Sequence, residues 1–100
     1  MITKHHFSDR VYAKESFLDA GIHVPKHVHN YSHLSILARG RALVTIDGVT
    51  ETYTGPVCIE IKKNVSHSVQ PITNDVVWYC IHATDCSDIT TIDEVLIETA

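Results

Sequence analysis

The most informative part of the sequence is residues 21–40, which read GIHVPKHVHNYSHLSILARG. It begins and ends with glycine, and it holds four of the eight histidines of the chain. Three of these histidines, His27, His29 and His33, follow one another at spacings of two and four residues. We expect the rest of the chain to be a scaffold that positions these side chains.

The segment before His29 is predicted to be a strand, because Pro25 disfavours a helix interior. Side chains two residues apart on a strand point the same way, so His27 and His29 are expected to project side by side. His33 follows a turn-like segment and can reach the same interior from the neighbouring strand. Converging imidazole rings bind divalent transition metals. The alternatives are a helix, which would also place His29 and His33 on one face, and surface histidines with no shared role.

Short β-rich segments follow one another along most of the chain. Asp47-Gly48, between two such segments, is the strongest hairpin signal. Together the segments predict an all-β fold, an antiparallel barrel or sandwich. The expected strands are residues 2–7, 10–18, 22–29, 33–38, 41–46, 49–54, 57–61, 65–72 and 76–83. A short C-terminal helix is expected around Ile92, Val95 and Leu96, which fall at i, i+3 and i+4, with a last strand as the alternative.

Length and composition exclude several classes of protein. One hundred residues suit one domain, so residues 1–100 are predicted to form a single domain. The net charge is −4 and no run of Lys and Arg occurs, which argues against a nucleic-acid partner. No apolar run reaches the length of a membrane span, so no membrane partner is expected. The N-terminal residues lack the apolar core of a signal peptide, and we expect a cytoplasmic protein.

The cysteines show no zinc-finger or redox spacing. Cys58, Cys80 and Cys86 form no C-x-x-C pair. Cys58 and Cys80 lie in apolar stretches and are expected to be small buried hydrophobic residues. Trp78 shares one face of the last predicted strand with Cys80, and the sequence leaves open which face looks inward. His82, in the same strand, is expected to be a satisfied or edge histidine.

The histidine stretch also resembles a known motif. The pattern Gly21-x5-His27-x-His29-x3-His33-x6-Gly40 is similar to the first cupin motif, in which glutamate normally stands where this chain has His33. The resemblance to the cupins covers roughly residues 10–83. The insert between the two cupin motifs is the short hairpin at Asp47-Gly48.

Residues 55–71 resemble the second cupin motif. His67 stands at the position of the family's last metal ligand. The family usually has proline and glycine where this chain has Lys62 and Asn64. Asparagine is the non-glycine residue that best tolerates positive φ, so Asn64 is expected to keep the turn.

The resemblance implies a small antiparallel β-barrel of the cupin type, a double-stranded β-helix or jelly roll. Motif one is residues 21–40 and motif two is residues 55–71. It also implies a homodimer in which the N-terminal strands pair with a second subunit. As in small cupins that bind metal through four histidines, it implies one divalent transition metal ion, Fe, Mn, Ni, Co, Cu or Zn, held by His27, His29, His33 and His67.

Two functions are compatible with such a site. The first is a metal-dependent oxidoreductase, an Fe- or Mn-type dioxygenase that acts on a small molecule. The second is a non-catalytic module that binds a metal or a small ligand, as a sensor or accessory protein does. Four neutral ligands leave the full charge of the ion in place, which favours anionic substrates. Glu60 is the only carboxylate close to motif two, which favours redox or Lewis-acid chemistry over proton abstraction.

Overall fold

The computed structural model describes residues 1–22, 24–29 and 31–84, with the backbone alone described at Pro25 and His27. The strands in this part of the chain are β1 (Ile2–Ser8), β2 (Val11–Leu18), β3 (Val24–His27), β4 (His33–Arg39), β5 (Arg41–Ile46), β6 (Val49–Thr54), β7 (Val57–Ile61), β8 (His67–Pro71) and β9 (Val76–Ala83). The predicted strands are confirmed, each within two residues at its ends. The predicted C-terminal helix lies outside the described residues.

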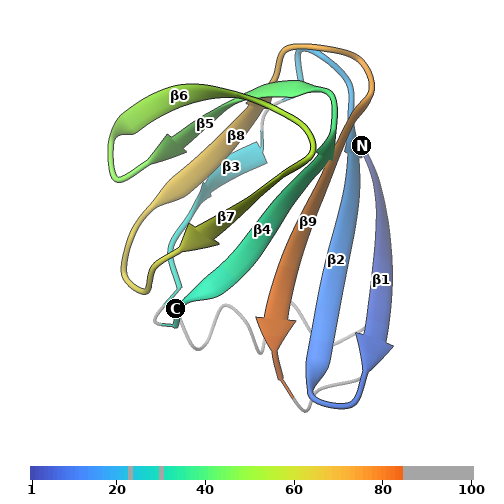
Figure 1. The fold of residues 1–100 in the computed structure, drawn as a ribbon, viewed down its shortest axis with the longest axis vertical. Coiled ribbons are helices and arrows are strands. Elements are labelled where there is room, and N and C mark those ends of the chain that lie inside the picture. The colour runs from blue at the N-terminus through green and yellow to red at the C-terminus, as the bar shows by residue number, and fades with distance from the viewer. Residues whose placement is uncertain (23, 30, 85–100) are drawn as a thin grey trace.

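The strands form two antiparallel sheets, as predicted. One has the order β1-β2-β9-β4-β7, and the other has the order β3-β8-β5-β6. Figure 1 shows the two sheets curving around each other, with β1 and β2 at the outer edge of the five-stranded sheet. Within the described residues, no helix has the length and apolarity needed to span a membrane.

The core lies between the two sheets, because strands of both contribute their inward-facing side chains. Its buried members are Leu18, Leu37, Ala42, Val44, Ile59, Ile61, Val69, Val76 and Trp78. Burying a Val, Leu or Ile side chain stabilises a fold by about 1.5–3 kcal/mol. This apolar cluster is therefore the main source of folding free energy in the described part of the chain.

The inward faces of three strands change from apolar to polar along their length. From the apolar end, these residues are Leu37, Ser35 and His33 on β4, Val69 and His67 on β8, and Val76, Trp78, Cys80 and His82 on β9. The period-2 alternation of a strand keeps each series on one face. The apolar core therefore passes directly into a layer of buried histidines at the other end of the barrel.

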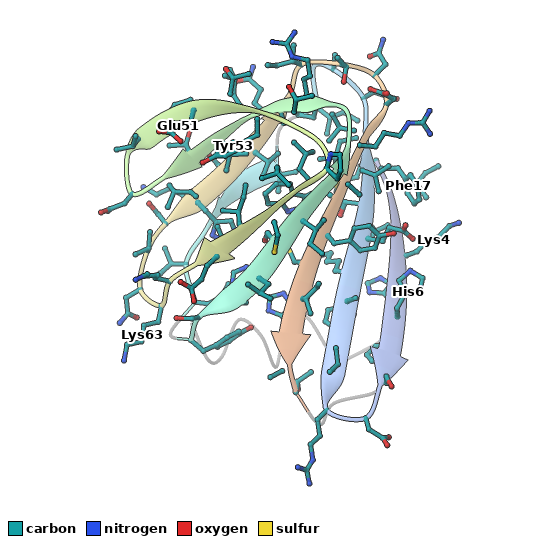
Figure 2. The ribbon with its side chains drawn as sticks, in the orientation of Figure 1. Lys4, His6, Phe17, Glu51, Tyr53 and Lys63 are labelled. Atoms are coloured by element: carbon teal, nitrogen blue, oxygen red, sulfur yellow. The ribbon has the colours of Figure 1, made fainter. Side chains whose placement is uncertain are left out.

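The outer face of the five-stranded sheet carries a polar cluster. Glu15 on β2 accepts hydrogen bonds from the Tyr79 hydroxyl of β9 and from His6 on β1, whose Nε2 lies 3.0 Å from the carboxylate. These two bonds, Tyr79 first, hold the pKa of Glu15 below its usual range. Lys4 lies over the ring of Phe17, 5.3 Å from its centroid, and Figure 2 shows both beside His6. The cluster ties β1 to the rest of the sheet.

Two glycines allow turns that other residues would strain. Asp47 and Gly48 both have positive φ, and Ile46 pairs with Val49, so the predicted hairpin is confirmed. Gly40 has a φ of 84° between β4 and β5. A Cβ atom there would lie 2.8 Å from Thr73 Oγ1 and 2.9 Å from a side-chain atom of Val76. A Cβ at Gly48 would meet nothing within 4 Å.

Gly40→Ala is therefore expected to destabilise the fold more than Gly48→Ala. Both replacements strain the backbone by about 1–2 kcal/mol. Gly40→Ala adds overpacking against Thr73 and Val76, which typically costs about 1–3 kcal/mol more. Urea unfolding of the two variants measures the difference. Equal free energies of unfolding would mean that the neighbours of Gly40 give way without cost.

Glu15→Gln is expected to lower the melting temperature at pH 7, and the deficit should shrink in acid. Folding lowers the pKa of the Glu15 carboxyl. Such a group stabilises the fold at pH values above its pKa in the unfolded chain, which is near 4.5. That contribution is lost as the pH falls through the folded pKa. Thermal unfolding between pH 7 and pH 3 tests this, with the exposed Glu60→Gln as the matched control. A deficit that stays constant across this range would rule out the charge of Glu15 as its cause.

Candidate metal centre

The four predicted ligands come from three segments of the chain. The backbone of His27 ends β3 and pairs with His67, the first residue of β8. His29 follows β3, and His33 is the first residue of β4. The side chain of His27 lies outside the described residues, so the geometry concerns the other three histidines.

The structure brings His29, His33 and His67 together. Their ring centroids are 5.4 Å apart for His29 and His33, 5.3 Å for His33 and His67, and 6.2 Å for His29 and His67. His33 and His67 are buried, with 6% and 5% of their surface exposed, and His29 is half-buried. Three imidazoles thus border one small volume in the interior.

A fourth histidine, His82, joins this cluster, although it was not among the predicted ligands. Its ring stacks on that of His33 at 4.7 Å and lies 5.5 Å from that of His29. It is no edge histidine, because β9 lies in the middle of its sheet. It shares the inward face of β9 with Trp78. Once the inward face of β9 is known, this alternation places His82 in the interior as well.

His82 is uncharged in this environment. Burial, followed by the neighbouring rings of His33 and His29, lowers the pKa of His82 to about 3. Its Nδ1 lies 3.1 Å from the Tyr31 hydroxyl, so the expectation of a hydrogen-bonded histidine is met. A neutral imidazole keeps a lone pair on one nitrogen, which is the form that binds a metal ion.

Aromatic side chains close the cluster on one side. Tyr12 on β2 is fully buried, and its ring stacks on His82 at 6.0 Å and on Phe7 at 5.0 Å. The Tyr12 hydroxyl lies 2.6 Å from Nδ1 of His5. The ring of Tyr31 lies 5.2 Å from that of His29. These rings separate the histidines from water on the side of β1 and β2.

Cys80 lies next to the histidines, and its sulfur is hydrogen-bonded. Trp78 Nε1 donates to Cys80 Sγ at 3.2 Å, and Ser35 Oγ donates to the same sulfur at 3.8 Å. One ligand atom each of His33, Cys80 and His82 lies within 4.8 Å of the others, which is close enough to hold a metal ion. Among the described residues, His33, Cys80 and His82 are the three donors whose ligand atoms all lie this close together.

The expectation that Cys58 is buried is wrong. Cys58 is exposed on β7. Its neighbours Ile59 and Ile61 both face the core, with 8% and 1% of their surface exposed. Val57 to Ile61 is an apolar stretch, but the alternation of the strand turns Cys58 to the outer face.

The turn between β7 and β8 fixes the loop that carries His29. Asn64 has a φ of 62°, so the prediction that it keeps this turn is confirmed. Its backbone N–H donates to the carbonyl oxygen of His29 at 2.7 Å, and the N–H of Lys63 donates to Ser32 Oγ at 3.1 Å. The second motif therefore positions a residue of the first motif through its backbone.

Asn64→Val is expected to destabilise the fold and to loosen this loop, whereas Asn64→Gly should be tolerated. A β-branched residue at positive φ is strongly disfavoured, while glycine adopts it at no steric cost. The measurement is the midpoint of urea unfolding, together with amide hydrogen exchange at Asn64. Loss of amide protection in Asn64→Gly as well would show that the side chain, not the backbone angle, holds the turn.

Comparison with known proteins supports the fold through structure alone. No protein-family model and no curated protein sequence matches the chain. Solved structures do. An RmlC-like cupin family protein with a double-stranded β-helix fold from Methanocaldococcus jannaschii is 20% identical, with a TM-score of 0.72 over 84% of this chain and 80% of that one.

Two further structures agree. KdgF from Halomonas sp. is 13% identical, with a TM-score of 0.76 over 87% of this chain and 81% of that one. A cupin 2 domain-containing protein from Halorhodospira halophila is 15% identical, with a TM-score of 0.74 over 92% and 73% of the two chains. The described strands, their order and these likenesses together show that the chain has the double-stranded β-helix fold of the small cupins.

Proposed function

We propose that the histidine cluster holds one divalent transition metal ion, with His27, His29, His33 and His67 as its ligands. The observation that carries this proposal is the meeting of three of these rings, from separate segments, in a buried volume. Both ring nitrogens of His33 and Nδ1 of His67 have almost no contact with solvent. Neutral imidazole is a common ligand of the borderline divalent metals.

The character of the donors selects the class of metal. Mg²⁺ and Ca²⁺ prefer oxygen ligands. Glu60, the one carboxylate within the second motif, is exposed on β7 and points away from its buried neighbours Ile59 and Ile61. The proposed ligands are all nitrogen donors, so Fe, Mn, Ni, Co, Cu and Zn are the candidates.

We further propose that the chain is a dioxygenase that acts on a small molecule. A bound Fe or Mn ion, whose charge four neutral ligands leave in place, would supply a redox-active and Lewis-acidic centre that attracts anionic substrates. The chain's own residues would shape the site. Tyr12 excludes water from one side, and Tyr31 is half-buried between His29 and His82. The Tyr31 hydroxyl is therefore placed to orient a small polar ligand.

Metal content tests the ligand assignment. Protein stripped with a chelator and reloaded with each candidate metal should bind about one ion per chain, measured by elemental analysis after gel filtration. His33→Ala and His67→Ala should each weaken binding by more than the roughly 10- to 100-fold that loss of an outer-shell partner costs. His6→Ala, exposed on the outer face of β1, is the matched control and should bind as the parent does.

Oxygen consumption tests the reaction. The Fe- or Mn-loaded protein should take up dioxygen with a member of a panel of diketones, thiols and phenols, and His33→Ala should not.

A His67→Ala protein that binds metal as tightly as its parent would overturn the ligand assignment. Tight binding of a redox-inactive metal alone, without turnover, would instead favour the non-catalytic binding module. Circular dichroism of each variant shows whether the fold is intact.

A further inference from the structure

Cys80 and His82 form a second group of donors beside the proposed site. They lie on the same face of β9, two residues apart, and point into the interior. His33 reaches them from β4, where Ser35 pairs with Cys80 and Leu34 pairs with Ile81. The ligand atoms of His33, Cys80 and His82 lie within 4.8 Å of one another. Two central strands of one sheet thus position all three donors.

Two hydrogen bonds at Cys80 would stabilise a metal-bound thiolate. The sulfur accepts from two donors, the Trp78 indole N–H at 3.2 Å and the Ser35 hydroxyl at 3.8 Å. Hydrogen bonds to an ionised acceptor are about twice as strong as those between neutral groups. Burial raises the pKa of the Cys80 thiol, so without a cation the site holds a neutral thiol. A coordinated metal ion reverses this preference, because a thiol that binds a metal loses its proton.

His82 is oriented by a hydrogen bond as metal-binding histidines usually are. Its Nδ1 lies 3.1 Å from the Tyr31 hydroxyl. In the tautomer whose Nδ1–H donates to this oxygen, Nε2 carries the lone pair. Such an outer hydrogen bond fixes both the tautomer and the plane of a ligating ring. The stacking of Tyr12 on His82 at 6.0 Å holds the ring from the other side.

We infer that His33, Cys80 and His82 form a binding site for a thiophilic metal ion of the Zn²⁺ or copper type. Two imidazoles and one thiolate are a donor set that such ions accept, whereas Mg²⁺ and Ca²⁺ prefer oxygen. As the ion binds, the thiol proton passes to solvent and a metal–sulfur bond forms. No oxidant or reductant takes part.

This site goes beyond the proposed function and shares only His33 with it. The proposed site needs His67, on β8 of the other sheet, and has no sulfur ligand. The two donor sets therefore make opposite predictions for two substitutions. Cys80→Ser removes the sulfur ligand and keeps the all-histidine set. His67→Ala removes a ligand of the all-histidine set and keeps His33, Cys80 and His82.

Co²⁺ is the probe, because a cobalt–thiolate bond gives an intense charge-transfer band that cobalt–imidazole bonds lack. The test protein carries Cys58→Ser and Cys86→Ser, so that Cys80 is its one thiol. Co²⁺ should produce the sulfur band at a stoichiometry of about one per chain. The band should disappear with Cys80→Ser or His82→Ala and persist with His67→Ala. Bound ion should also slow alkylation of Cys80 at least 10-fold.

Each other outcome is informative. Co²⁺ that binds without the sulfur band, in a manner that depends on His67, would overturn this inference and leave the proposed function in place. A sulfur band with no dependence on His67 supports the inference and counts against the proposed ligand set. No binding of Co²⁺ to a folded protein overturns both. If Cys80→Ser fails to fold, the alkylation rate of the Cys80-only protein with and without Co²⁺ still decides, since unprotected alkylation contradicts the site.

Discussion

The burial of several imidazole rings in one small interior limits how the rest of the barrel can be built. His33, His67 and His82 have between 3% and 6% of their surface exposed. A charged imidazole in that setting would be costly, and burial accordingly lowers the pKa of His82 to about 3. Neutral rings still carry polar nitrogens, whose burial is unfavourable unless a hydrogen bond or a metal ion satisfies them. Stabilisation of the fold therefore comes mainly from the apolar part of the interior.

The apolar half of the barrel supplies that stabilisation. Trp78, Leu37 and Val69 lie on the same strand faces as the histidines, toward the opposite end. A rigid, close-packed core fixes the direction of each strand, and the strand then fixes the direction of each histidine. The backbone bond from Asn64 to His29 does the same for the one loop that contributes a ring. The packed core and the chain turns, which lie outside the site, therefore set the positions of the site's side chains.

Much of this arrangement could be predicted from the sequence, because its causes are local. Asp47-Gly48 and Asn64 marked turns that need positive φ, and the structure has those angles. The spacing of His29 and His33 and the second-motif position of His67 placed three rings together. The side chain of His27 and the C-terminal segment lie outside the described residues, so those predictions stay open.

What could not be predicted depends on which face of a strand looks inward. For β9 the sequence offered Trp78 and Cys80 on one face and Tyr79 on the other, and all three are compatible with a core. The Tyr79 hydroxyl donates a hydrogen bond to Glu15 on the outer face of the sheet. The two residues are far apart in the sequence, so the sequence does not predict this contact. Once that face is known, His82 and Cys80 follow by parity. The same argument places Cys58 on the outer side of β7.

The position of His33 makes the chemistry of the site a question of competition. Its ring lies between His67 at 5.3 Å and His82 at 4.7 Å, so it can serve either an all-histidine set or one that includes the Cys80 sulfur. A neutral imidazole has one nitrogen with a free lone pair, so a neutral His33 ring can serve one set or the other but not both. At identities of 13–20%, the similar structures share the fold and carry no information on this choice. Under the two proposals, the identity of the bound metal would therefore decide between redox chemistry at the histidine set and binding at the set that includes the Cys80 thiolate.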